Sequence, residues 1–174
     1  MPSSRILISS QTLGTAAATV TFSSIPSTYR DLVVRLSLND NSGSVDRFHL
    51  IINNDTGNNY SLTRLVGDGS TATSMRQSGV GFMYLGYNTV PSYTNIFGSS
   101  EIYIPNYASA AIHPVGSISV GERNATESYI VPTAGLYNSA SAITQLEIKS
   151  PFYTFTAGSS FYLYGYFPVQ KSQY

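Results

Sequence analysis

The stretch Ile25–Leu38, with the sequence IPSTYRDLVVRLSL, decides the fold of this chain. Pro26 fixes its own φ and favours an extended residue before it, so the stretch begins as a turn. From residue 32 onward, apolar side chains recur at every second position, as in a strand that packs one face on a core. The side chains on this face are Leu32, Val34, Leu36 and Leu38. Tyr29, just before the strand, is placed to close the end of the core while its hydroxyl stays in water.

The same alternation recurs along the chain and predicts about ten short strands separated by turn residues. Besides the strand at 32–38, the stretches with this pattern are residues 5–9, 18–22, 47–53, 60–66, 79–86, 101–104, 112–123, 129–131, 143–149 and 160–167. We expect residues 47–53 and 60–66 to pair as an antiparallel hairpin, because a polar loop of turn residues joins them. We expect residues 88–98 to form a long ordered loop.

Many short strands and no helical periodicity are typical of an all-β protein, here an antiparallel β-sandwich with a jelly-roll-like arrangement. The chain has 174 residues, enough for one domain with a sizeable core. Neither an internal repeat nor a linker divides it. The sequence therefore predicts a single β-sandwich domain over residues 1–174.

The composition combines few charges with many tyrosines. Charged residues make up 10% of the chain and the formal net charge is +0, whereas about a quarter of an ordinary soluble domain is charged. A surface of Ser, Thr, Asn, Gly and Tyr repels itself little, so it suits self-association or contact with a large partner. All-β proteins are also rich in Thr and Tyr because of strand propensity alone. The Lys and Arg residues form no cluster, which argues against a nucleic-acid partner.

The chain contains no cysteine, so we expect neither a disulfide framework nor a thiolate metal site. Near the start, the only apolar run is Ile6, Leu7 and Ile8. This run is too short for a signal peptide or a membrane span. We therefore expect synthesis and folding in a cytoplasm, and no membrane partner.

Candidate catalytic and metal-binding residues are few and scattered. The two histidines, His49 and His113, lie in separate predicted strands, and nothing in the spacing joins them to supporting carboxylates. The acids in or beside predicted loops are Asp40, Asp46, Asp55 and Asp68. Such positions suit either calcium ligands or turn formation; the segment 40–46 lacks the sixth-position Gly and the closing Glu of an EF-hand. We expect no metal, no cofactor and no enzymatic activity.

The most specific feature is a row of tyrosines in the last predicted strand. Alternation places these rings on the face opposite Phe161 and Leu163. An exposed tyrosine row makes a good interface because the rings are large, rigid and amphipathic. A second sheet or a loop over the same face would instead bury the row within the chain. The candidate interface residues are Tyr162, Tyr164, Tyr166 and, from the turn before residue 32, Tyr29.

Two segments resemble small structural proteins of tailed bacteriophages and related environmental viruses. They are residues 24–34, SIPSTYRDLVV, and residues 160–166, SFYLYGY. Similar first and last strands occur in jelly-roll virion proteins of the capsid decoration (cement), head-fibre and tail-fibre types. Neither segment carries a catalytic residue.

The resemblance implies a non-enzymatic virion protein, made in the host cytoplasm and located on the capsid surface. Its partners would be the major capsid protein and other copies of itself, as a homotrimer. By binding assembled shell rather than free subunits it would stabilise the shell. The alternative is a host-recognition module of a tail or head fibre that binds surface carbohydrate through tyrosine rings and Asn/Asp loops. A third function, a small polysaccharide hydrolase, would need two carboxylates that face each other.

Overall fold

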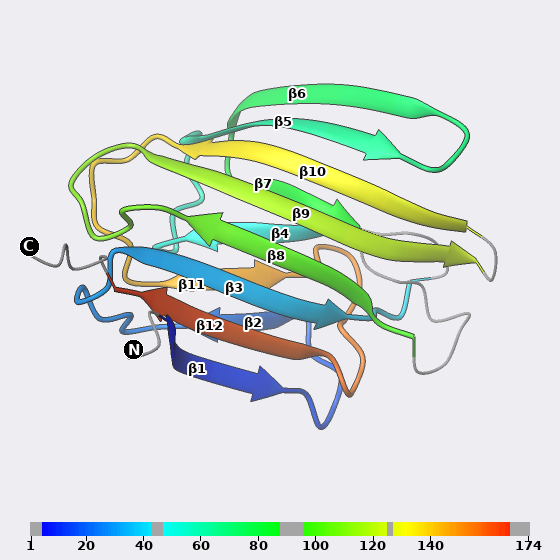
Figure 1. Cartoon of the computed structure of the whole chain (residues 1–174), viewed down its shortest axis with the longest axis horizontal. Coiled ribbons are helices and arrows are strands. Elements are labelled where there is room, and N and C mark those ends of the chain that lie inside the picture. The colour runs from blue at the N-terminus through cyan, green and yellow to red at the C-terminus, as the bar shows by residue number, and fades with distance from the viewer. Residues whose placement is uncertain (1–4, 43–46, 88–95, 125–126, 168–174) are drawn as a thin grey trace, which may run out of the picture.

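The computed structural model describes residues 5–42, 47–87, 96–124 and 127–167. The described residues form two layers of strands (Figure 1). The strands are β1 (Arg5–Thr12), β2 (Thr19–Phe22), β3 (Asp31–Leu38), β4 (Arg47–Ile52), β5 (Tyr60–Gly67), β6 (Ala72–Val80), β7 (Met83–Tyr87), β8 (Gly98–Ile104), β9 (His113–Asn124), β10 (Glu127–Tyr137), β11 (Leu146–Lys149) and β12 (Ser160–Tyr166). Within these residues there is no helix that could span a membrane.

The strands form a large sheet of eight, in the order β1-β12-β3-β8-β9-β10-β5-β6, and a small sheet of four, in the order β2-β11-β4-β7. If the hairpins β5–β6 and β9–β10 are set aside, the rest form two four-stranded sheets, β1-β12-β3-β8 and β2-β11-β4-β7. This is the strand order of a jelly roll. The predicted antiparallel, jelly-roll-like sandwich is therefore confirmed, and the two hairpins are insertions that widen one of its sheets.

The core lies between the two sheets and is built by the alternation that the sequence shows. The predicted apolar face of β3 is buried, and so are Phe161 and Leu163 on the neighbouring strand β12. Opposite them, the small sheet contributes Phe48, Leu50 and Ile52 from β4. Because one-residue slips would turn these side chains to the solvent, the alternation fixes the register of the central strands.

The predicted hairpin of residues 47–53 with 60–66 is wrong, since β4 belongs to the small sheet and β5 to the large one. The loop between them crosses the end of the sandwich. Tyr60 holds this crossing: its hydroxyl accepts a hydrogen bond from the backbone N–H of Ile52 at 3.0 Å and donates to the carbonyl of Asp55 at 2.8 Å. A buried tyrosine hydroxyl thus supplies hydrogen bonds that a hairpin ladder would otherwise make.

Residues 79–86, predicted as one strand, belong to two strands in different sheets. β6 ends at Val80 in the large sheet, and β7 begins at Met83 in the small sheet. Gly81 lies at the crossing, where a Cβ would be 2.5 Å from the carbonyl oxygen of Thr56. Gly79 has a φ of 65° beside a register shift in the β5–β6 ladder. Gly79 thus marks a bulge and Gly81 a close approach of another backbone segment, as glycines within strand patterns often do.

One other segment differs from the sequence-based expectation. The short strand predicted at 129–131 is part of β10, which continues through Pro132 to Tyr137. Proline usually excludes an interior strand because it has no N–H for the ladder, which hid most of this strand from prediction. The loop predicted over residues 88–98 falls largely outside the described residues.

The edge of the small sheet at β7 packs directly against the large sheet. The hydroxyls of Ser117 and Ser119 on β9 donate to the carbonyls of Leu85 and Tyr87, at 2.9 and 3.2 Å. Gly86 permits this approach, because a Cβ there would collide with Ser119. Beyond β7, the hairpin β5–β6 extends past the small sheet (Figure 1).

Candidate functional site

The face of the large sheet that points away from the core, called here the outer face, carries the predicted tyrosine row. Tyr162, Tyr164 and Tyr166 are half-buried there, while Phe161 and Leu163 are buried on the inner face. The rings of Tyr162 and Tyr164 lie 6.5 Å apart with an interplanar angle of 20°. The small sheet packs on the other face of β12, so it does not cover the row.

Strand β1 orders part of the tyrosine row. The guanidinium carbon of Arg5 lies 4.7 Å from the centroid of the Tyr164 ring, within the range of a cation–π contact. Leu7 is opposite Tyr164 in the β1–β12 register. The row is therefore a fixed, partly covered surface, whose rings need little ordering when a partner binds.

Tyr29 does not belong to this row. Its ring lies on the core side of β12, where it fills the space that a side chain at Gly165 would occupy. It also contacts Phe167, with the two ring centroids 5.0 Å apart. Tyr29 therefore closes one end of the core, as the sequence predicts, and the structure separates it from the three tyrosines of the outer face.

A second apolar surface, which sequence reasoning missed, lies on the inserted hairpins. It consists of exposed side chains on the outer face of β5, β9 and β10, called here the aliphatic patch: Leu65, Ile118, Val120, Ile130, Pro132 and Leu136. Leu65 is 54% exposed and Ile130 is 48% exposed. The register places Pro132 opposite Ile118 and Ile130 opposite Val120, so these side chains are neighbours.

A signal for this patch exists in the sequence. The sequence predicts one alternating strand over residues 112–123, but within it an odd-numbered residue and an even-numbered one lie on opposite faces. Val115 is buried on the inner face, whereas Ile118 and Val120 are exposed on the outer face. A strand that is apolar on both faces indicates either a second covering layer or a surface that binds something.

A shallow groove adjoins the aliphatic patch, between β10 and β6. Its volume is about 330 Å³, and its lining residues are Ser61, Leu62, Thr63, Arg76, Ala134, Gly135 and Leu136. The groove contains one ionisable side chain, Arg76, and no carboxylate. It therefore adds binding surface without an acid–base pair.

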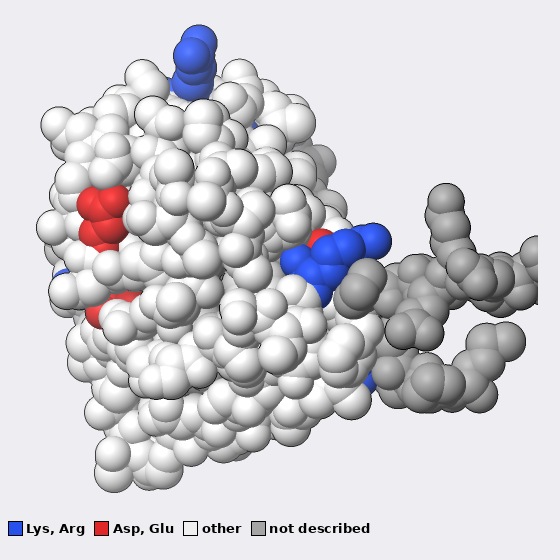
Figure 2. Space-filling view, turned by 90° about the vertical axis from the view of Figure 1, so that its left-hand side faces the viewer, with Lys and Arg blue, Asp and Glu red and all other residues white. Residues whose placement is uncertain are grey.

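A polar strip on β3 and β8 separates the tyrosine row from the aliphatic patch. Here Arg35 Nε donates to Glu101 Oε2 at 2.8 Å, and both side chains are about half exposed. Such an exposed pair contributes little stability. Charge is also sparse at the end of the molecule that lies on the left in Figure 1: Figure 2 shows small, separate groups of acids and bases on a largely uncharged surface. The described residues at this end form no continuous basic surface for a nucleic-acid backbone.

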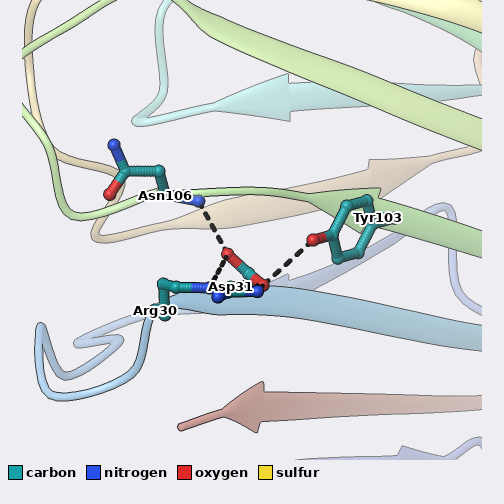
Figure 3. Close-up of polar contacts among 4 residues, drawn as sticks. All are labelled: Arg30, Asp31, Tyr103 and Asn106. Carbon is teal, nitrogen blue, oxygen red and sulfur yellow. Dashed lines mark hydrogen bonds and ion pairs between the residues drawn. The ribbon is translucent and has the colours of Figure 1, made fainter. Parts of the chain in front are cut away.

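At one end of the polar strip, Asp31 ties β3 to β8 (Figure 3). Its carboxylate accepts hydrogen bonds from Arg30 Nη2 at 2.7 Å, from the Tyr103 hydroxyl at 2.9 Å and from the backbone N–H of Asn106 at 3.0 Å. Burial raises the pKa of Asp31, but the hydrogen bonds outweigh burial and hold this pKa below its usual value. The buried carboxylate therefore has a structural role, since both of its oxygens already accept hydrogen bonds from within the chain.

The Asp and Asn side chains of the loops mainly form hydrogen bonds with backbone and side-chain groups of the same chain. Asp55 accepts hydrogen bonds from Asn59 Nδ2 at 2.8 Å, from the N–H of Gly57 at 2.8 Å and from the Tyr137 hydroxyl at 3.0 Å, which lowers its pKa. Other loop side chains held in this way are Asn39, Asn41, Asn53 and Asp68. These groups form turns, which leaves fewer of them to bind a sugar.

His49 lies on the outward side of the small sheet, between two aromatic rings. Its ring stacks on the Phe82 ring, with the two centroids 4.0 Å apart, and packs edge-on against the Tyr84 ring, with centroids 4.4 Å apart. Burial, with the positive charges of Lys149 and Arg47 nearby, lowers the pKa of His49 to about 4. The imidazole is therefore neutral near pH 7.

His113 belongs to the other sheet, where it is buried and its Nε2 lies 2.9 Å from the carbonyl oxygen of Ser141. The fold does not bring the two histidines together. Asp40 is buried and binds the N–H and hydroxyl of Ser42, while Asp46 lies outside the described residues. In the part of the chain that the structure describes, no three His, Asp or Glu side chains cluster as a metal site would require.

No protein-family model, no curated protein and no solved structure matches this chain. Its function has to be inferred from the fold and the surfaces described above.

Proposed function

We propose that this protein is a capsid decoration (cement) protein of a bacteriophage, which binds the outside of the shell and stabilises it. The observation that carries this proposal is the outer face of the large sheet, where the tyrosine row and the aliphatic patch share one rigid surface. A broad outer face with two apolar surfaces, which the polar strip separates, fits a macromolecular partner better than a small ligand, which prefers a deep pocket. The proposed partner is the major capsid protein, and the proposed location is the virion surface.

The segments that resemble virion proteins contribute two strands to the large sheet. Residues 24–34 lead into β3 and residues 160–166 form nearly all of β12, and these two strands are paired in the large sheet. The jelly-roll arrangement occurs in viral capsid proteins, although a fold by itself does not determine a function. Resemblance, fold and surface therefore support the same proposal.

The size of the aliphatic patch suits such a contact. Burying its six side chains would remove on the order of 500 Å² of apolar surface, worth roughly 10 kcal/mol before the entropy of association is subtracted. A protein that binds assembled shell but not free subunits stabilises the shell by mass action. The low charge of the chain permits many copies to crowd on one lattice. The homotrimer expected from the resemblance stays a prediction.

One observation favours the second candidate, a carbohydrate-binding module of a tail or head fibre. Phe152 is 77% exposed and Tyr153 is 41% exposed in the segment between β11 and β12. This segment is tied down on both sides, by the N–H of Ser150 to the carbonyl of Ala18 and by the N–H of Thr154 to Asn41 Oδ1. Rigid exposed rings can stack on sugars, but the internal bonding of the Asn and Asp loops weighs against this function. No observation favours a polysaccharide hydrolase, and we infer a non-enzymatic protein.

Binding to virus particles tests the proposal. Purified protein is mixed with capsids that lack it, and co-sedimentation and the temperature of shell disruption are measured. We expect the wild-type protein to bind and to raise that temperature, and the variant Ile118→Ser/Ile130→Ser to stay folded but to lose binding. The matched control is Ile6→Ser, which changes an aliphatic residue of similar exposure on β1. Failure of the wild-type protein to bind capsids, with binding to cell-envelope polysaccharide instead, would favour the fibre module.

A further inference from the structure

The two sheets have four edge strands, and three of these edges are protected. At β7, serine hydroxyls of β9 occupy two carbonyls of the edge. β2 has only four residues, and β1 is interrupted by a register shift between Leu7 and Ser9. Short strands and bulges are ways in which proteins prevent unwanted pairing at an edge.

β6 has only one of these protections, a register shift beside Gly79 near its end, which leaves Ala72–Ser78 regular. It has nine residues, Ala72–Val80, and each of them is exposed or half-buried. It lies beyond the small sheet (Figure 1), and no described segment pairs with its outer edge. Its sequence, ATSMRQSGV, contains no proline and only one charged residue, Arg76. A long edge of this kind is a template for the addition of another strand.

We propose that β6 pairs antiparallel with β6 of a second copy of this chain, about a two-fold axis perpendicular to the sheet and centred on Met75. The regular part of the strand determines this centre. Gly79 has a φ of 65° and the β5–β6 register shifts beside it, so a ladder can extend over Ala72–Ser78. The midpoint of that segment is Met75, and pairing about it uses the whole segment in both copies.

The single charge of β6 selects the same register. A two-fold axis perpendicular to the sheet keeps outer-face residues opposite outer-face residues. When the pair of strands is centred on Met75, Arg76 lies opposite Ser74 of the second copy, and Thr73 lies opposite Gln77 of the second copy. Centring the pair on Arg76 would oppose two guanidinium groups, which is unfavourable for directly opposite residues.

Symmetry favours a second copy over a foreign strand as the occupant. In the register centred on Met75, that residue lies opposite its own copy, every other side chain of Ala72–Ser78 meets a small or hydrogen-bonding one, and no acid is required from the partner. Leu65 is opposite Ser74 in the β5–β6 ladder. The aliphatic patches of the two copies would therefore lie on the same side of one continuous sheet, with the two β6 strands between them. The pairing does not depend on the capsid partner proposed above.

Sedimentation velocity over a range of concentrations tests the pairing. We expect a monomer–dimer equilibrium for the wild-type chain. Ser74→Arg places like charges opposite each other at two symmetric positions, so the dimer dissociation constant should rise roughly five- to tenfold. Ser74→Glu should lower it by a similar factor, and the double variant Ser74→Arg/Arg76→Ser should restore the wild-type value. The matched control is Ser10→Arg, which changes an exposed serine on the opposite edge strand β1 and should leave the dimer dissociation constant unchanged.

Hydrogen exchange supplies an independent readout. We expect alternate amides of Ala72–Ser78 to become protected as concentration rises, while circular dichroism shows every variant folded. A chain that stays monomeric at several hundred micromolar would overturn the proposal. So would the homotrimer expected from the resemblance, because a two-fold pairing of β6 joins only two copies. A dimer whose dissociation constant is the same for the wild-type chain, Ser74→Arg and Ser74→Glu would also overturn it.

Discussion

The ring of Tyr29 lies against the Cα of Gly165, in the space that any larger residue at 165 would need. Gly165 is the one position on the inner face of β12 without a side chain, since Phe161 and Leu163 fill the others. The glycine and the tyrosine are therefore a matched pair that closes this end of the core.

Gly165→Ala should be destabilising because its methyl group would overlap the Tyr29 ring. Overpacking of this kind typically costs about 1–3 kcal/mol of unfolding free energy, measured here by urea denaturation. Gly116→Ala is the matched control, since a Cβ at Gly116 has no heavy atom within 4 Å and the residue lies in a strand. The control should be neutral or slightly stabilising. Equal stability of the two variants would show that Tyr29 moves away without penalty.

Alternation explains how much of this fold the sequence predicts. β3 and β12 were predicted with their faces because a one-sided core forces period two on them. β6 was missed for the opposite reason. Its inner face, with Thr73, Met75 and Gln77, extends past the small sheet, so no core requires apolar residues there.

The other errors have equally local causes. A polar loop of turn residues looks the same whether it turns within a sheet or crosses between sheets, and the deciding contact is made by the hydroxyl of Tyr60. The tyrosine row was predicted because its strand has one clearly apolar face. The aliphatic patch was missed because β9 carries apolar residues on both faces. The alternating pattern predicted over residues 112–123 did not separate Val115, on the inner face, from Ile118, on the outer face.

The tyrosine row can be removed with little loss of stability if it serves as an interface. Tyr162 and Tyr166 are half-buried, so Tyr162→Ser/Tyr166→Ser should stay folded, with a loss of unfolding free energy of about 1–2 kcal/mol. The same variant should lose capsid binding. Phe161→Ser, a buried neighbour on the same strand, is the contrast and should cost several kcal/mol, roughly 3–5. A double tyrosine variant that binds capsids normally would remove the row from the proposed contact surface.

Arg64 should be replaceable with a gain in stability. Its side chain is buried on the inner face of β5, where Nη2 donates to Met75 Sδ at 2.8 Å. Its Nε and Nη1 have no hydrogen-bond partner in the described structure. Burial lowers the pKa of this guanidinium. Because a buried and poorly paired charge is unfavourable, Arg64→Met should raise the unfolding free energy by about 1–3 kcal/mol in urea denaturation.

Arg35→Met is the control for this change. Arg35 is about half exposed and paired with Glu101, so its replacement should change stability by less than about 1 kcal/mol. The guanidinium carbon of Arg64 also lies 5.5 Å from the centroid of the Tyr87 ring. A loss of stability in Arg64→Met larger than that in Arg35→Met would mean that this cation–π contact outweighs the cost of burying the charge.

His49 should make the fold less stable in mild acid. Its pKa in the folded chain is about 4, because burial and two nearby cations disfavour the imidazolium, whereas the unfolded value is about 6.5. Between these two values the unfolded chain binds a proton that the folded chain does not. Stability is therefore fully present above about pH 6.5 and falls as the pH drops toward 4, by an amount on the order of 2–3 kcal/mol. His49→Phe keeps a ring between Phe82 and Tyr84 but cannot titrate. Urea denaturation at pH 7.5 and pH 4.5 should therefore show a smaller loss of unfolding free energy in the variant than in the wild-type chain. An NMR titration of His49 with a midpoint near 6.5 would contradict this account.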